Sequence, residues 1–459
     1  MSDGSRQSVM FESIAEKPVV VKFDQPNQSS DGGAILLKAV DDQMGLSEAL
    51  TQGLEDRRQA GKVDHELPVL LRQRIYGIAC GYFDGNDAAK LRRDPVMKLA
   101  CHGEASGEQG LASQPTLSRF ENAWTRTDLM RAGVALARTV IASLKQRRRG
   151  RPVRQITIDL DPMCDPTHGE QQLTFFNGYY DTWCYLPTVV TVQLDQDSDK
   201  YLVGVVLRAG DRSRNAHDGV AILRRVLGLV REAFGGASVT VRMDSEFAAP
   251  EMFEYLEAQE RLVYDVAIAA NAVLKRRAAP LMAKAKAKAQ KKGETQRRYR
   301  AFRYAAESWN KKRRVVVKTE YLIYPGRLPR ENYRFVVTNA KGSARRAYET
   351  YCGRGDQENK LDELKNQLRM DLTSCTKFLA NQFRCLLTAA AYALYQSLRH
   401  KAQGTSLERA EVQTLRDRII KVAAVVIQSV RRIWVRLPEN FPWAFEWARI
   451  AMRCGAESG

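Results

Sequence analysis

The sequence lacks closely spaced cysteines: eight are scattered along 459 residues, and no two form a C-x-x-C pair. With only five histidines, it also lacks the Cys/His spacing that is typical of zinc sites. A zinc module and a compact disulfide framework are therefore excluded, and reduced thiols in a cytosol are the simpler expectation.

Long apolar runs are missing as well. The nearest approach, Leu386 to Leu398, ends at Arg399, short of the roughly 18 to 20 apolar residues that a membrane-spanning helix needs. Residues 1–30 are polar and show no charged-then-apolar leader. We therefore expect no membrane partner and a cytoplasmic protein.

Acidic residues are scarce relative to basic ones: 72 Lys and Arg stand against 53 Asp and Glu, a net charge of +19. Between Asn271 and Arg346 the chain has 23 basic and 4 acidic residues, which leaves 49 of each elsewhere. A surplus confined to one segment predicts a surface for the phosphate backbone of nucleic acid, although a solvated helix and linker is the alternative. The residues that we predict to contact DNA form two clusters: Arg297, Arg298 and Arg300, then Lys311, Lys312, Arg313 and Arg314.

The pattern of apolar residues predicts an α/β core with insertions. Residues 155–160 alternate as a strand does, whereas 35–145 and 344–400 follow helical spacing. We expect a flexible N-terminus (1–30), a helical DNA-binding domain (31–150), the first part of the core (151–270), a basic insertion with β-strands (271–343), a return to the core with one helix and a following helix (344–400), and a helical C-terminal region (401–459).

Two local predictions belong to the helical parts. Ser113 to Ser118 is typical of a helix start after a turn, which suits a helix-turn-helix and equally a simple cap. Leu407 to Val435 is expected to form one amphipathic helix that either dimerises or packs.

Carboxylates stand at the ends of two predicted strands. Asp159 and Asp161 end the first strand and share one face, because alternate side chains of a strand do. Asp244 ends a later strand, with Glu246 shortly after it. Ligands of open α/β sheets gather at the carboxyl ends of strands, although a strand-end Asp more often caps the next helix.

A third acid, Glu358, lies in a predicted helix. At about 100° per residue, Tyr351, Arg354, Glu358 and Lys365 fall on one helical face. An acid flanked by two cations and a phenol suits a metal site beside phosphates.

These residues carry a resemblance. The spacing Y-x2-R-x3-E-x6-K resembles the signature of a large branch of bacterial DDE transposases. Further motifs are similar to those of the insertion-sequence thirteen-eighty group, and the similarity runs from about residue 67 to 400. These motifs include Ile158–Asp161, Asp165–Gly169, Phe176–Tyr180, Leu207–Gly210, Arg242–Ser245 and Asn381–Arg384.

The resemblance implies an RNase H-like catalytic core, a mixed sheet flanked by helices. It implies a catalytic triad of Asp161, Asp244 and Glu358 that binds two Mg²⁺ or Mn²⁺ ions, with Asp159 as the alternative first ligand. Tyr351, Arg354 and Lys365 would contact DNA.

The implied function is that of an insertion-sequence transposase acting on double-stranded DNA, as a homodimer on DNA. The resemblance thus also implies a bacterial, nucleoid-associated protein. It would cut at the terminal inverted repeats and transfer strands into target DNA, by cut-and-paste with a hairpin intermediate. The alternatives are a catalytically silent DNA-binding repressor and an RNase H-like endonuclease that cuts without joining.

Overall fold

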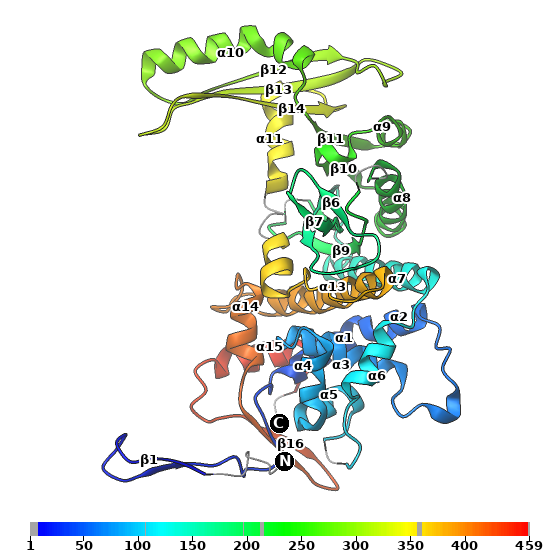
Figure 1. The fold of residues 1–459 in the computed structure, drawn as a ribbon, viewed down its shortest axis with the longest axis vertical. Coiled ribbons are helices and arrows are strands. Elements are labelled where there is room, and N and C mark those ends of the chain that lie inside the picture. Colours follow the sequence, from blue (N-terminus) through cyan, green and yellow to red (C-terminus); the bar gives the residue numbers. More distant parts are fainter. Residues whose placement is uncertain (1–7, 106, 196, 212–214, 356–359, 458–459) are drawn as a thin grey trace.

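A computed structural model describes residues 8–105, 107–195, 197–211, 215–355 and 360–457. The chain is built on one eight-stranded mixed sheet with helices packed against it (Figure 1), which confirms the predicted α/β class. From edge to edge the strands are β12 (Gln296–Tyr304), β13 (Arg313–Leu322), β14 (Arg330–Thr338), β11 (Leu262–Ile268), β10 (Ser238–Met243), β4 (Gln155–Pro162), β8 (Thr188–Leu194) and β9 (Tyr201–Val206).

The middle of the sheet mixes two pairing directions. β4, β10 and β11 run parallel, whereas β8 and β9 are antiparallel to their neighbours. β4 is buried almost along its whole length, with Ile156, Ile158 and Leu160 on one face. The carboxylates Asp159 and Asp161 point to the opposite face, as the alternation predicts.

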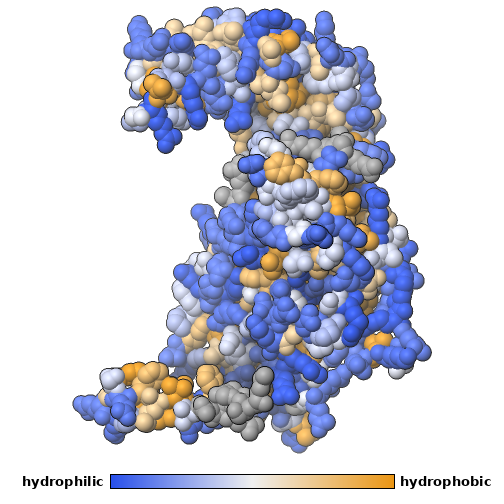
Figure 2. Space-filling model, viewed as in Figure 1, coloured by the Kyte–Doolittle hydropathy of each residue, from blue (hydrophilic) through white to orange (hydrophobic). Residues whose placement is uncertain are grey.

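The basic segment extends the same sheet. β14 pairs with β11, and β13 and β12 follow outward. α10 (Ala272–Lys292) covers this extension with one apolar stripe, which includes Leu274 and Met282, and leaves Lys284 and Lys286 exposed. We call α10 with β12, β13 and β14 the arm. In Figure 1 it overhangs the rest of the molecule, and Figure 2 shows a hollow below it.

Helices before β4 join a later helix to form what we call the helical body, α1 to α7 with α13. α13 (Phe378–Lys401) is buried along most of its length because it lies between the sheet and the N-terminal helices, and a single hydrophobic core spans both. The N-terminal helices are α1 (Ala34–Met44), α2 (Leu46–Gly53), α3 (Leu67–Ala79), α4 (Gly85–Lys90), α5 (Pro95–His102), α6 (Gln114–Glu121) and α7 (Arg126–Arg147).

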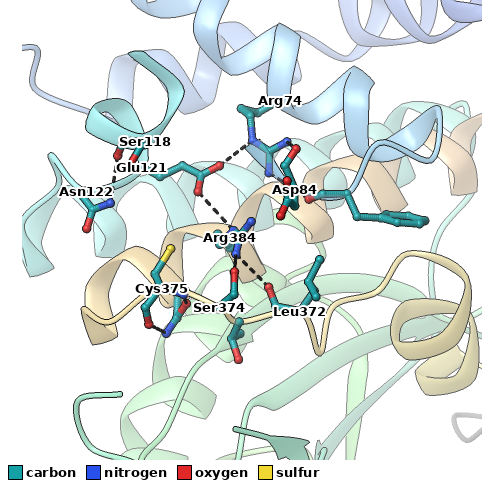
Figure 3. A network of polar contacts seen from close by, with 12 residues as sticks. Arg74, Asp84, Ser118, Glu121, Asn122, Leu372, Ser374, Cys375 and Arg384 are labelled. Atoms are coloured by element: carbon teal, nitrogen blue, oxygen red, sulfur yellow. Dashed lines mark hydrogen bonds and ion pairs between the residues drawn. The ribbon is translucent and has the colours of Figure 1, made fainter. Parts of the chain in front are cut away.

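A buried ionic network fixes the helical body (Figure 3). Glu121 at the end of α6 accepts from Arg74 Nε of α3 at 2.6 Å and pairs with Arg384 Nε of α13 at 3.2 Å. Arg384 also donates to the Ser374 Oγ atom at 2.5 Å. One carboxylate thus ties two N-terminal helices to α13 and to the loop before it.

The remaining described helices flank the sheet or close the chain. α8 (Asn215–Ala233) and α9 (Pro250–Glu257) are joined to strands of the core, and α11 (Ala344–Cys352) leads back from the arm. α14 (Val412–Leu415) and α15 (Ala444–Arg453) lie near the C-terminus. Within the described part of the chain, every helix is too short or too polar to cross a membrane.

Two helix predictions are wrong. The segment from Leu407 to Val435 is not one helix: it contains α14, a π-helical turn (Arg416–Ile420) and the strands β15 (Ala424–Gln428) and β16 (Ile433–Arg436). Its β-branched residues pair with each other and with β3 (Gln28–Ser29), so tertiary pairing replaces helical spacing.

The segment from Tyr351 to Lys365, which was predicted to form one helical face, is also not one regular helix. α11 ends at Cys352, a 3₁₀ turn covers Gly353–Gly355, and Glu363–Gln367 form a π-helix. The predicted single face from Tyr351 to Lys365 therefore does not follow from α-helical spacing.

Candidate active site

The carboxyl ends of β4 and β10 bring two predicted acids together. The strands are parallel and pair Arg242 with Asp159 and Met243 with Leu160. Asp161 is the next residue of β4, and Asp244 directly follows the end of β10. Because neighbouring strands lie about 4.8 Å apart, these two carboxylates share one edge of the sheet.

Asp161 is buried, with its side chain 4% exposed, yet it is poorly satisfied. Its Oδ1 atom forms an ion pair with Arg354, but no hydrogen bond of good geometry from the described residues reaches it. A buried carboxylate is costly without compensating charge. Arg354 supplies that charge here, so Asp161 lies where a positive group is favoured.

Asp159 is fully engaged instead. Arg242 Nε and Nη2 donate to its two oxygens at 2.6 and 2.7 Å, and Lys200 Nζ lies 3.0 Å from Oδ2. All three side chains are buried. Two cations held by one carboxylate make a structural cluster, and Asp159 has no oxygen to spare.

The same cluster positions the end of α11. Arg242 Nη1 donates to the Thr350 carbonyl oxygen at 2.9 Å, and Lys200 Nζ donates to that of Gly353 at 2.7 Å. Cations favour the carbonyl end of a helix. A side chain at Gly353 would start 2.5 Å from Arg242 Nη1, so glycine permits this close approach.

Asp244 is partly exposed and caps a 3₁₀ turn (Ser245–Phe247) by accepting from the Ser245 backbone N–H at 2.5 Å. Burial, and after it the charge of Asp244, raises the pKa of Tyr351 well above its usual range. The phenol therefore stays protonated beside Asp244. The Arg354 guanidinium lies 5.6 Å from the centre of the Tyr351 ring.

Lys365 approaches the site from the π-helix. Its Nζ donates to the carbonyl oxygen of Cys164 at 3.2 Å, just past the end of β4. Tyr351, Arg354 and Lys365 thus gather near the two aspartates, although not on one helix. Glu358 lies outside the described residues, and none of the described residues form a group of three His, Cys, Asp or Glu side chains arranged to hold a metal.

Two further acids lie beside this edge. Asp165 is fully buried and accepts from Thr373 Oγ1 at 2.8 Å, and burial raises its pKa to about 8. Glu246 is nearly buried and lies 3.6 Å from the buried Arg208. The sequence motif contained Asp165 but gave no sign of its burial, because Thr373 is about 200 residues away.

The predicted DNA contacts of the arm fall into two groups. Arg300 and Lys312 are exposed and Arg298 is half-buried, whereas Arg297 pairs with Glu320 at 2.8 Å and Lys311 with Glu257 at 2.9 Å.

The other two predicted contacts, Arg313 and Arg314, are engaged by groups of the protein itself. Arg313 is buried, donates to both oxygens of Glu257, and lies over Trp309. Arg314 donates to the carbonyl oxygens of Ala340 and Gly342. We therefore assign both arginines to the structure of the arm.

Comparison with known proteins bears on this arrangement. A search of curated proteins finds no match. The profile of the family described as Transposase DDE domain group 1 matches residues 11–455, nearly the whole chain. With aspartates at the ends of two neighbouring strands and cations around them, this match leads to one conclusion: the chain belongs to the DDE transposase family.

Proposed function

We propose that this transposase cuts DNA at the ends of a bacterial insertion sequence and joins the freed 3′ hydroxyl to target DNA. The observation that carries the proposal is the parallel pairing of β4 with β10, which ends at the residues just before Asp161 and Asp244. The strand order β9-β8-β4-β10-β11, with only the last three parallel, supports an RNase H-like core.

The donor set fits two divalent ions. Asp161, Asp244 and Glu358 would hold Mg²⁺ or Mn²⁺, which prefer oxygen ligands. The engagement of Asp159 by two buried cations, Arg242 and Lys200, argues for Asp161 rather than Asp159 as the first ligand. When bound, such a pair activates the attacking oxygen and stabilises the leaving oxygen of a phosphodiester.

The chain's own groups prepare the anionic substrate. Arg354 and Lys365 supply positive charge at the edge of the sheet, and the protonated Tyr351 phenol is able to donate a hydrogen bond to a phosphate oxygen. The Asp159–Arg242–Lys200 cluster keeps the end of α11, and with it Arg354, at this edge.

The arm would hold the duplex beyond the site. Arg297, Arg298, Arg300, Lys311 and Lys312 supply sequence-independent contacts to phosphates. Two element ends require two catalytic subunits, so we propose a homodimer on DNA and a cut-and-paste reaction with a hairpin intermediate.

Incubation of the full chain with element-end duplex and Mg²⁺ tests this function. We expect nicked strands, followed by products that link the donor end to target DNA. Glu358→Gln should abolish cleavage and leave DNA binding nearly intact, whereas the neighbouring Asp362→Asn should still cut.

Two results would contradict the proposal. A shift in the electrophoretic mobility of the DNA, with every strand uncut, would identify a catalytically silent DNA-binding protein. Cut strands that are never joined would identify a nuclease.

A further inference from the structure

An aromatic hollow lies on the small sheet that follows β4. This sheet is formed by β5 (Asp165–Pro166), β7 (Thr182–Tyr185) and β6 (Phe175–Asn177). The hollow has a volume of about 470 Å³ and is lined by Phe175, Phe176, Asn177, Gly178, Tyr179, Trp183, Gly210 and Asp211.

Its aromatic rings are exposed. Phe176 and Trp183 face each other across β6 and β7, with ring centres 6.3 Å apart, and they are 53% and 56% exposed. Tyr179, in the turn between the strands, is 74% exposed. Contiguous exposed apolar surface of this kind marks a binding site more often than chance.

Hydrogen bonds and a close backbone approach fix the shape of the hollow. Asn177 Nδ2 donates to the carbonyl oxygen of Gly210 at 3.2 Å, and the Asn177 side-chain oxygen accepts from the Tyr179 backbone N–H at 3.0 Å. A side chain at Gly210 would start 2.2 Å from the carbonyl oxygen of Cys184, so only glycine fits there. The rings of Phe176 and Trp183 are thus presented by a fixed hairpin.

The hollow also adjoins the proposed active site. β5 begins four residues after Asp161, and Lys365, a predicted DNA contact, donates to the carbonyl oxygen of Cys164 directly before β5. Under the proposed function, DNA at the carboxyl end of β4 would lie at the start of this small sheet.

We infer that this hollow binds unpaired nucleobases of single-stranded DNA by stacking them on Phe176, Tyr179 and Trp183. Every base has a face that stacks on an aromatic ring, whatever its sequence. The Asp211 carboxylate in the lining has the acceptor character that the amino groups of base edges require. The inference rests on the proposed function only in placing DNA nearby.

The chemistry of the hollow favours bases over a second copy of the chain. The protein has another exposed apolar element, the hairpin of β1 (Val9–Phe11) and β2 (Val19–Val21), but five of the six residues in its strands are aliphatic. An aliphatic ribbon suits a protein partner. Flat rings with a polar rim suit planar, hydrogen-bonding bases.

Binding of a fluorescent dT20 strand by the full chain, in EDTA, tests the inference. Trp183→Ala and Phe176→Ala should each weaken binding of the single strand by about tenfold, the typical effect of losing one stacked base. Trp183→Phe should retain most of the affinity, and Trp183→Leu, which is apolar but not aromatic, should lose it. Trp434→Ala, which removes an exposed tryptophan from β16, is the matched control.

Two kinds of result would overturn the inference. Unchanged affinity in Trp183→Ala and Phe176→Ala, or an equal loss for duplex of the same length, would overturn the inference. A change in the mass of the protein in solution, with dT20 affinity unchanged, would instead assign the hollow to self-association.

Asp161→Asn separates this inference from the proposed function. It should bind dT20 as the wild type does while losing cleavage. Absence of cleavage in the wild type would refute the proposed chemistry and leave the stacking result standing.

Discussion

The arm and the helical body use their cations in opposite ways. In the helical body, Arg74 and Arg384 are buried against one acid, Glu121. In the arm, Arg300 and Lys312 are exposed on a segment with 23 basic and 4 acidic residues. The comparison shows that burial, rather than the number of cations, separates structural charge from charge available to DNA.

The largest effect on stability is expected in the helical body. Glu121→Gln leaves two buried arginines without their counter-charge, and breaking a buried pair typically costs about 3 to 5 kcal/mol. Thermal or denaturant unfolding measures the loss. A change below about 1 kcal/mol would show that the network is dispensable.

A smaller effect on stability is expected from pH. Burial raises the pKa of Asp165 to about 8 in the folded chain, above its usual value of 3.8, so folding favours the protonated form. The stabilising contribution is complete below about pH 4 and is lost as pH rises toward 8. Asp165→Asn should flatten this part of the pH profile of unfolding, and an unchanged slope would show that Asp165 is ionised in the folded state.

The exposed cations should matter for DNA and not for stability. Arg300→Ala should weaken duplex binding regardless of sequence and reduce the salt slope by about one. Arg313→Ala should instead lower the unfolding temperature, because Arg313 pairs with Glu257 in a buried place. Binding titrations at several salt concentrations and thermal unfolding curves measure the two effects. If Arg300→Ala lowered the unfolding temperature and Arg313→Ala changed only the DNA affinity, the roles assigned to these two arginines would be wrong.

The smallest effect is expected at an exposed pair of α11. Arg345 and Glu349 lie one turn apart with Nε and Oε1 at 2.7 Å, and both side chains are more than half exposed. Such pairs contribute about 0.3 to 0.5 kcal/mol. Glu349→Gln should therefore leave the unfolding temperature almost unchanged, and a loss as large as that of Glu121→Gln would refute the role assigned to burial.

Local patterns predicted the strands of the core and the acids at their ends. Period-two alternation places Asp159 and Asp161 on one face, and the structure agrees. The different roles of these acids depend on Lys200 and Arg242, which are 41 and 83 residues from Asp159. Only the register of β4 with β10 brings Arg242 opposite it.

Other features could not be predicted for the same reason. β15 and β16 have apolar spacing compatible with a helix, but pairing with β3, nearly 400 residues earlier, decides the outcome. The basic segment was expected as an insertion, yet its strands continue the central sheet because β14 pairs with β11. The positions of Tyr351, Arg354 and Lys365 follow from contacts rather than from one helical face.

The most direct test of the proposed catalytic set is a crystal structure with element-end DNA and Mn²⁺, located by its anomalous signal. We expect manganese bound by the carboxylates of Asp161 and Asp244, with Asp159 still paired to Arg242 and Lys200. Manganese on Asp159, or none within coordination distance of Asp161 and Asp244, would contradict it.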